Sequence, residues 1–258
     1  MIKLFLLMGI IFAQETPASN TCTLQMEVTG AIGAATLDDL QRAQKKAERE
    51  NCGALLLLIN TPGGSLHTTR LIVDEIFNSP RPILCLVHPA GAHAGSAGAI
   101  ILQACHVAGA MEATNIGAAT PIAATGEKIP EDLRNKLLND TISWLEGITK
   151  LRDRNLEFSR EIVSKAKAVD AKEALKLGAI EFVAKSSDEF LQFCQNRKVK
   201  LSVSKEVEVQ VGPIVKYETD LRSQLLSLIT DPQIAYIMFM GSLGLIYFEL
   251  THPGTFAP

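Results

Sequence analysis

The chain has 258 residues, of which 47% are hydrophobic, and its formal net charge is -3. This length is enough for one substantial hydrophobic core with a small appendage. Because basic residues are not in excess, the composition argues against nucleic acid as a partner.

The N-terminus has the features of a short secretory signal. Lys3 precedes an apolar run from Leu4 to Ala13, and a polar stretch follows it. We therefore expect a signal peptide over residues 1–14, either cut near Ala13 or kept as an anchor. The alternative is a first strand buried in the fold.

Apolar runs that predict strands alternate along the chain with amphipathic segments that predict helices. Strands are expected at Leu24–Val28, Ala54–Asn60, Ile83–Val87, His106–Met111 and Ala179–Ala184. Helices are expected at Leu37–Glu50 with Thr36 as its cap, Leu66–Asn78, Ser96–Ala104, Glu131–Lys165 and Asp170–Gly178. Since the strands are apolar throughout, the pattern indicates an α/β fold with a layered parallel sheet and helices on both faces.

The C-terminal part has a different character. Lys198–Val211 alternates apolar and polar residues, which predicts an antiparallel ribbon, and a helix at Glu218–Ile229 leads to an apolar run at Ile234–Phe248. Fifteen helical residues cover about 22 Å, against about 30 Å of hydrocarbon. We expect membrane insertion because apolar residues cover every side of this helix. The alternatives are a re-entrant or interfacial helix and the docking of two helices.

The five cysteines are odd in number and widely spaced, so they predict neither a disulfide framework nor a metal site. Most are expected to be small core residues. The sequence leaves a bridge between Cys22 and Cys52 open if the compartment is oxidising.

Two glycine-rich turns follow predicted strands. Residues 60–65 read Asn-Thr-Pro-Gly-Gly-Ser, and residues 91–98 read Gly-Ala-His-Ala-Gly-Ser-Ala-Gly. The small neighbours of Ser96 allow a substrate backbone to approach its hydroxyl, and the amides at the start of the next helix can stabilise an oxyanion. Both turns end strands of one sheet, so we expect them to form one site with Ser96 as nucleophile.

A serine nucleophile needs a base to take its proton. His88 and His93 are expected to be exposed loop residues, and His106 lies about 15 Å away at the far end of the Ser96 helix. A lysine can serve where apolar surroundings lower its pKa, and Lys128, Lys136 and Lys150 are candidates. Spacing alone favours a surface ion pair of Lys136 with Asp140 over a catalytic role.

Several motifs together resemble the N-terminal serine protease part of the NfeD family of membrane proteins, which is similar in fold to Clp protease and signal peptide peptidase A. The resemblance spans about Leu24 to Pro258. The motifs that carry it are Thr61–Gly64, Gly91–Gly98, Ile116–Pro121, Lys136–Asp140, Ala171–Ile180, Asp231–Pro232 and Phe248–Gly254.

This resemblance implies a Ser96–Lys136 dyad, with oxyanion donors at the amides of Gly64 and Ala97. It also implies that Gly63 and Ser65, on the Gly63–Leu66 edge, bind an extended peptide. No cofactor or metal is implied. The expected activity is serine endopeptidase cleavage of hydrophobic, membrane-proximal segments, with a stomatin-like membrane protein as substrate and partner, and a homodimer or higher homo-oligomer is expected.

The domain organisation follows from these elements. We expect a signal peptide at 1–14, a Clp-like protease domain at 20–195, a β ribbon and linker helix at 196–230, and a membrane segment at 231–252. The protease domain is expected outside the cytoplasm. Longer relatives continue with more membrane helices and an OB-fold domain, so the resemblance implies that this chain is a truncated form or a fragment.

Two departures from the family pattern are Asn60, where aspartate is common, and Gly95, where alanine is usual. Two other functions stay open at this point. One is a membrane scaffold with the same fold and no turnover. The other is a crotonase-type enzyme, which uses similar glycine turns to hold a thioester enolate and has a carboxylate as base.

Overall fold

The computed structural model describes residues 21–122, 129–202, 204–219, 225, 229 and 232–252. The predicted signal peptide, the candidate base Lys128 and most of the predicted helix at 218–229 lie outside these residues.

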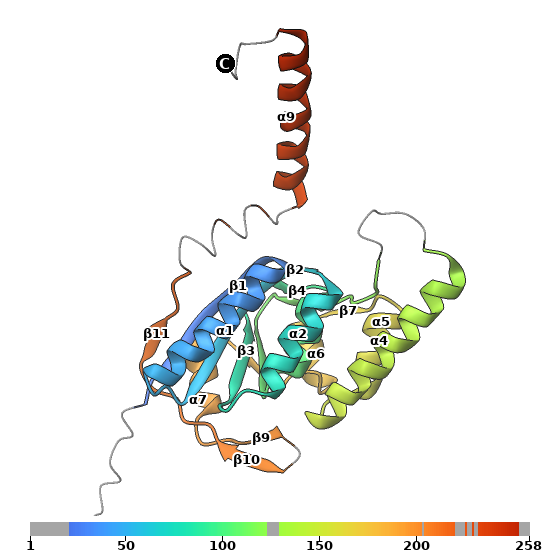
Figure 1. Ribbon diagram of the computed structural model, residues 1–258. Helices are drawn as coiled ribbons and strands as arrows, with labels where there is room; N and C mark the ends of the chain where they lie inside the picture. Colours follow the sequence, from blue (N-terminus) through green and yellow to red (C-terminus); the bar gives the residue numbers. More distant parts are fainter. Residues whose placement is uncertain are drawn as a thin grey trace, which may run out of the picture.

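One mixed sheet organises the described residues (Figure 1). Its strands are β1 (Thr23–Ile32), β2 (Ala54–Gly64), β3 (Ile83–Val87), β4 (His93–Ala94), β5 (Val107–Met111), β6 (Asn115–Gly117), β7 (Ala168–Asp170), β8 (Phe182–Ala184) and β11 (Ile214–Lys216). They run in the order β7-β6-β4-β2-β3-β5-β8, and β1 pairs with both β2 and β11. Every pair is parallel except β6 with β7, so the predicted fold class is confirmed.

The helices of the described residues were largely predicted from periodicity. They are α1 (Ala34–Arg49), α2 (Leu66–Phe77), α3 (Ala97–Ala104), α4 (Glu131–Leu151), α5 (Leu156–Ser164), α6 (Ala171–Lys176), α7 (Ser187–Cys194) and α9 (Pro232–Thr251). The short elements β6, β7 and α7 were not predicted, because three to eight residues carry too little periodic signal.

Side chains of β2 point alternately into two cores, which explains why its first six residues, Ala54–Ile59, are all apolar. Leu55, Leu57 and Ile59 belong to the larger core, under α1 to α6. Their neighbours Leu56 and Leu58 face a smaller core that contains Phe190 and Leu191 of α7 and residues of the ribbon. The sheet is therefore covered on both faces, as expected for parallel strands.

Two predicted helix details are wrong. Thr36 does not cap α1: Gly33 is the N-cap, and its N–H donates to the Thr36 hydroxyl at 3.3 Å. The predicted helix at Glu131–Lys165 is two helices, α4 and α5, separated by a turn in which Asp153 has a φ of 54°. Asn155 then caps α5 by accepting a hydrogen bond from the Phe158 N–H at 2.8 Å.

The cysteine prediction is also wrong in part. The bridge between Cys22 and Cys52 is present, and a second disulfide joins Cys85 to Cys105. The second pair was missed because β3 and the end of α3 are brought together only by the fold, twenty residues apart in sequence. Cys194 is a buried free thiol in the smaller core, as expected of a core residue.

The C-terminal elements follow the predicted order. β9 (Lys198–Ser202) and β10 (Lys205–Glu208) form the antiparallel ribbon. Helix α9 is longer than the predicted apolar run, since it begins at Pro232 and reaches Thr251. Its 20 residues cover about 30 Å, and Ile234–Thr251 is long and apolar enough to cross a membrane.

Candidate active site

Ser96 lies in a strained turn between β4 and α3. It is the N-cap of α3, with φ 46° and ψ -111°, and its side chain makes no capping hydrogen bond. Positive φ at a residue other than glycine costs about 1–3 kcal/mol and persists only where surrounding contacts hold it. The serine hydroxyl is therefore held away from the role that an N-cap serine usually has.

Two backbone hydrogen bonds hold this turn from neighbouring segments. The Ser96 N–H donates to the carbonyl of Ala118 at 2.8 Å, and the Gly95 N–H donates to the carbonyl of Thr61 at 2.9 Å. The Ser96 backbone is thus fixed by the loop after β6 on one side and by β2 on the other.

The two glycine-rich turns pack directly on each other. Gly63 has a φ of +121°, and a Cβ on it would lie 2.5 Å from the Ser96 Cβ and 3.1 Å from the Ser96 Oγ. A Cβ on Gly95 would lie 2.9 Å from the Pro62 carbonyl oxygen. The two turns therefore lie against each other as predicted, and the close approach explains why glycine occupies these positions.

The start of α3 leaves one amide available beside Ser96. The Gly98 N–H donates to the Gly95 carbonyl at 2.8 Å, and the Ala99 N–H donates to the Ser96 carbonyl at 3.1 Å. Among the hydrogen bonds of the described residues, none has the Ala97 N–H as donor. A helix N-terminus with an open amide is suited to an oxyanion.

Ser96 opens into a groove with a volume of about 1320 Å³. The groove is lined by the end of β1, by Pro62 and Gly64 at the end of β2 and Ser65 after it, by Ala97 and Ile100 of α3, and by Ala118 to Ile122. Apolar side chains provide most of this surface, and Glu27 and Asp39 are the carboxylates in it. Both predicted glycine turns therefore reach the same groove.

Lys136 lies on the N-terminal half of α4, where its side chain is exposed. The next residue, Leu137, lines the groove that contains Ser96. The ion pair with Asp140 that spacing favoured is not formed, because Asp140 pairs with Arg70 of α2. Arg70 also stacks on Trp144 at 4.3 Å, so these contacts fasten α4 to α2. The role of Lys136 as base stays a prediction.

The three histidines nearest to Ser96 in sequence give no better base. His106 is 7% exposed, and its Nδ1 accepts a hydrogen bond from the Ile83 N–H at 3.0 Å. Burial, and then the positive charge of Arg152, lower the pKa of His106 to about 3. His93 is exposed and His88 is half-buried, and neither lines the groove.

Ser65 has a structural role that the sequence did not indicate. Its Oγ accepts a hydrogen bond from the Thr68 N–H at 3.2 Å and caps α2, and its N–H donates to the Ile32 carbonyl at 3.0 Å. Its own carbonyl accepts from the Thr69 N–H and hydroxyl. Ser65 also lines the groove, and its predicted role in peptide binding stays a prediction.

One group of possible metal ligands occurs among the described residues. Atoms of Cys22, Glu50 and Cys52 lie within 4.8 Å of one another. Because the two sulfur atoms are bonded to each other, the group provides no thiolate. It also lies apart from the groove, whose lining contains none of these residues.

Comparison with known proteins identifies a relative. No family model matches the chain. The chain is 30% identical over 256 residues to the membrane-bound protease PH1510 of Pyrococcus horikoshii, and the match covers 96% of this chain and 57% of that protein. The chain therefore spans little more than half the length of this curated relative.

Solved structures agree with this match. A lysine-to-alanine mutant of the 1510-N membrane-bound stomatin-specific protease, in complex with a substrate peptide, superposes with a TM-score of 0.75 at 28% identity, covering 83% of this chain and 99% of that one. A serine-to-alanine mutant gives a TM-score of 0.72 at 27% identity, covering 78% and 100%. The chain is thus a homologue of the membrane-bound protease PH1510, and its α/β unit has the fold of that protease's N-terminal part.

Proposed function

We propose that the chain is a membrane-attached serine endopeptidase with Ser96 as nucleophile and Lys136 as general base. The observation that carries this proposal is the strained turn of Ser96, against which Gly63 packs and which opens into the groove. The relative supports it further, since its substituted serine and lysine lie 41 positions apart, against 40 between Ser96 and Lys136.

In the proposed reaction the neutral amine of Lys136 takes the proton of the Ser96 hydroxyl, and Oγ attacks the carbonyl carbon of the peptide. The amides of Ala97 and Gly64 stabilise the oxyanion, the leaving amine takes the proton, and water then hydrolyses the acyl-enzyme. Lys136 is exposed without substrate. The proposed role requires that a peptide bound in the groove beside Leu137 shields this amine from water.

The proposed substrates are apolar segments of membrane proteins. Ile122 lines the groove and is 86% exposed, so it offers an apolar surface at the groove to a bound peptide. The relative is named for its specificity toward stomatin, and we propose a stomatin-like protein as partner and substrate here. The homo-oligomer that the resemblance implies stays a prediction.

The activity is tested with the full chain in detergent, a serine-directed fluorophosphonate and peptides from apolar membrane-proximal segments. The wild type should be labelled at Ser96 and cleave the peptides, and Ser96→Ala and Lys136→Ala should lower turnover by a factor of about a thousand or more. Ser202→Ala on the ribbon and Lys150→Ala on α4 are matched controls that should keep full activity. Equal cleavage by wild type and Ser96→Ala would overturn the proposal.

A second candidate is the scaffold without turnover, which the exposure of Lys136 favours. It predicts binding of the same peptides with neither labelling nor cleavage. Labelling of Ser96 also separates the protease from a crotonase-type enzyme, which needs no serine nucleophile.

We also propose that the protease domain faces an oxidising compartment outside the cytoplasm. Two disulfides support this, because such bonds form and persist mainly in exported proteins. Alkylation of the chain denatured directly from cells, before and after reduction, should modify these four cysteines only after reduction. Alkylation of these four cysteines without reductant would contradict the proposed location.

A further inference from the structure

The segment Ala118–Thr120, which follows β6 and lines the groove, is held by hydrogen bonds on two sides. On one side the Ala118 carbonyl accepts the hydrogen bond from the Ser96 N–H at 2.8 Å. On the other side the Ala119 N–H donates to the Ile162 carbonyl at 2.7 Å, and the Thr120 hydroxyl donates to the Val163 carbonyl at 2.7 Å. The Ser96 backbone is therefore connected to the C-terminal end of α5 through three residues.

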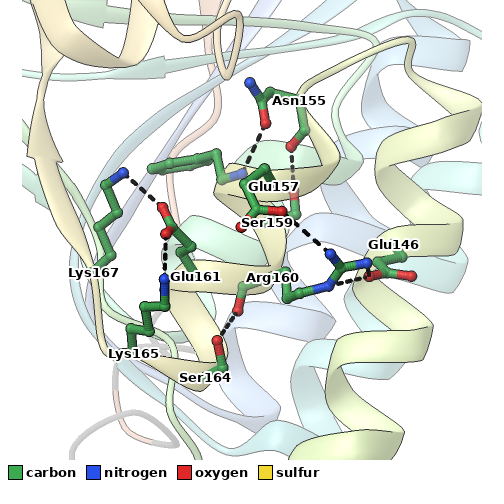
Figure 2. A network of polar contacts seen from close by, with 10 residues as sticks. Glu146, Asn155, Glu157, Ser159, Arg160, Glu161, Ser164, Lys165 and Lys167 are labelled. Carbon is green, nitrogen blue, oxygen red and sulfur yellow. Dashed lines mark hydrogen bonds and ion pairs between the residues drawn. The ribbon is translucent and has the colours of Figure 1, made fainter.

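The end of α5 is itself fixed by charged side chains (Figure 2). The carboxylate of Glu161 accepts hydrogen bonds from Lys165 at 2.8 Å and from Lys167 at 2.7 Å. These hydrogen bonds lower the pKa of Glu161 to about 2. On the opposite side of α5, Arg160 bonds Glu146 of α4 at 2.6 Å. The carbonyls of Ile162 and Val163 thus lie in a helix end that side-chain contacts hold in place.

Of the three residues in this segment, only Thr120 has a polar side chain. Ala118 and Ala119 have methyl groups alone, and the following residue, Pro121, has no N–H to donate. The hydrogen bond from the Thr120 hydroxyl to Val163 is thus the contact between this segment and α5 that replacing a side chain can remove. Thr120 is half-buried and lines the groove.

We propose that Thr120 is a positioning residue for Ser96. Its hydroxyl holds the Ala118–Thr120 segment on α5, so that the Ala118 carbonyl keeps Ser96 in its positive-φ conformation. This inference rests on the proposed function, in which Ser96 is the nucleophile, and it adds a residue that does not touch the reacting atoms.

The experiment compares Thr120→Val with Thr120→Ser and with Thr114→Val in the full chain. Thr114 lies six positions earlier, and its hydroxyl donates to the Met111 carbonyl at the same 2.7 Å, but it does not hold the Ala118 carbonyl. Thr120→Val should lower kcat and the rate of fluorophosphonate labelling by about tenfold or more with little change in KM. Thr120→Ser should restore both rates, and Thr114→Val should leave them unchanged.

A second measurement does not depend on activity. Amide hydrogen exchange at the Ser96 N–H should be about tenfold faster in Thr120→Val than in Thr114→Val, because the acceptor Ala118 is no longer held. If Ser96 exchange is the same in both variants, the positioning role is wrong. A rise in KM alone in Thr120→Val would mean that Thr120 contacts the substrate, and it would also overturn the positioning role. Absence of cleavage by the wild type would instead count against the proposed function, while the exchange measurement still tests Thr120.

Discussion

At the scale of single residues, Ser96 and Gly63 depend on each other. Ser96 adopts φ 46°, and the space next to its Cβ is available only because Gly63 has no side chain. Gly63 itself has φ +121°, outside the range of residues with a Cβ. The position of Ser96, the proposed nucleophile, is therefore set by a residue from the other glycine-rich turn.

We expect Gly63→Ala to abolish most activity. Its methyl group would lie 2.5 Å from the Ser96 Cβ, so Ser96 must move by about 1 Å to reach an ordinary contact distance. A displacement of that size costs about a hundredfold in turnover. Turnover and the rate of labelling by a fluorophosphonate measure the effect.

Gly178→Ala is the control for backbone strain. Gly178 has φ +71° with nothing within 4 Å of an added Cβ, and it follows α6, apart from the groove. It should lose about 1 kcal/mol of stability without losing activity. If Gly63→Ala is labelled as fast as the wild type, the close contact between Gly63 and Ser96 does not affect the reactivity of Ser96.

Local sequence predicted the Ser96 turn, because glycines clustered at the end of an apolar strand are typical of a tight turn. Spacing favoured a surface position for Lys136, which is exposed, but it could not predict the partner of Asp140, since Arg70 comes from a helix seventy residues earlier. The disulfide between Cys85 and Cys105 was missed for the same reason. Contacts between distant segments are set by the fold rather than by local spacing.

At the scale of elements, α3 is held at both ends. Its N-terminus is Ser96, and its last carbonyls accept hydrogen bonds from two buried arginines. Arg154 Nη1 bonds the Leu102 and Gln103 carbonyls at 3.1 and 2.7 Å, and Arg152 Nε bonds the Ala104 carbonyl at 2.7 Å. Positive charge at a helix C-terminus is stabilising.

These arginines explain why the predicted helix at 131–165 is broken. The turn between α4 and α5 contains neither glycine nor proline, so its local signal is limited to Asp153 and the cap residue Asn155. Arg152 and Arg154 leave the helix to cap α3, and Arg154 also pairs with Glu181 at 2.6 Å. Tertiary contacts thus override a continuous helical pattern.

We expect His106, directly after α3, to make the fold sensitive to weak acid. Its pKa is about 3 in the folded chain, against 6.5 ordinarily. Below pH 6.5 the unfolded chain binds a proton that the folded chain does not, so stability falls as the pH decreases from 6.5 towards 3. The expected loss is about 1.4 kcal/mol per pH unit, or about 2–3 kcal/mol between about pH 7.5 and about pH 4.5.

The measurement is urea unfolding of wild type and His106→Asn at several pH values. Asparagine keeps an acceptor for the Ile83 N–H and does not titrate, so the variant should lose most of this pH dependence. The pKa of Glu161 is about 2 in the folded chain and 4.5 ordinarily. Its contribution to stability is therefore lost only as the pH falls below about 4.5, which lies below the interval between about pH 7.5 and about pH 4.5 over which the His106 effect is measured. Equal slopes for both proteins would contradict the assignment to His106.

At the scale of the whole molecule, β1 joins the two ends of the described α/β unit. It pairs with β2 along most of its length and with β11 at Thr23–Gln25. The Thr23 N–H donates to the Pro213 carbonyl at 3.0 Å, and the Tyr217 N–H donates to the Gln25 carbonyl at 2.7 Å. The sequence predicted the layers of the sheet but not β11, whose three residues are too few to recognise.

This arrangement predicts where the chain can be cut without loss of the fold. A chain of residues 21–219 keeps β11 and lacks α9, of whose candidate span none is buried. It should be recovered without detergent and unfold cooperatively, whereas residues 21–258 should need detergent for extraction.

A chain of residues 21–212 lacks β11 and leaves the buried Thr23 and Gln25 at an unpaired edge. Its Tm should be lower by about 5 °C or more than that of residues 21–219. Thermal unfolding followed by circular dichroism measures this difference. Equal Tm values would mean that β11 adds nothing to the fold. Recovery of residues 21–219 only with detergent would mean that α9 is not what attaches the chain to the membrane.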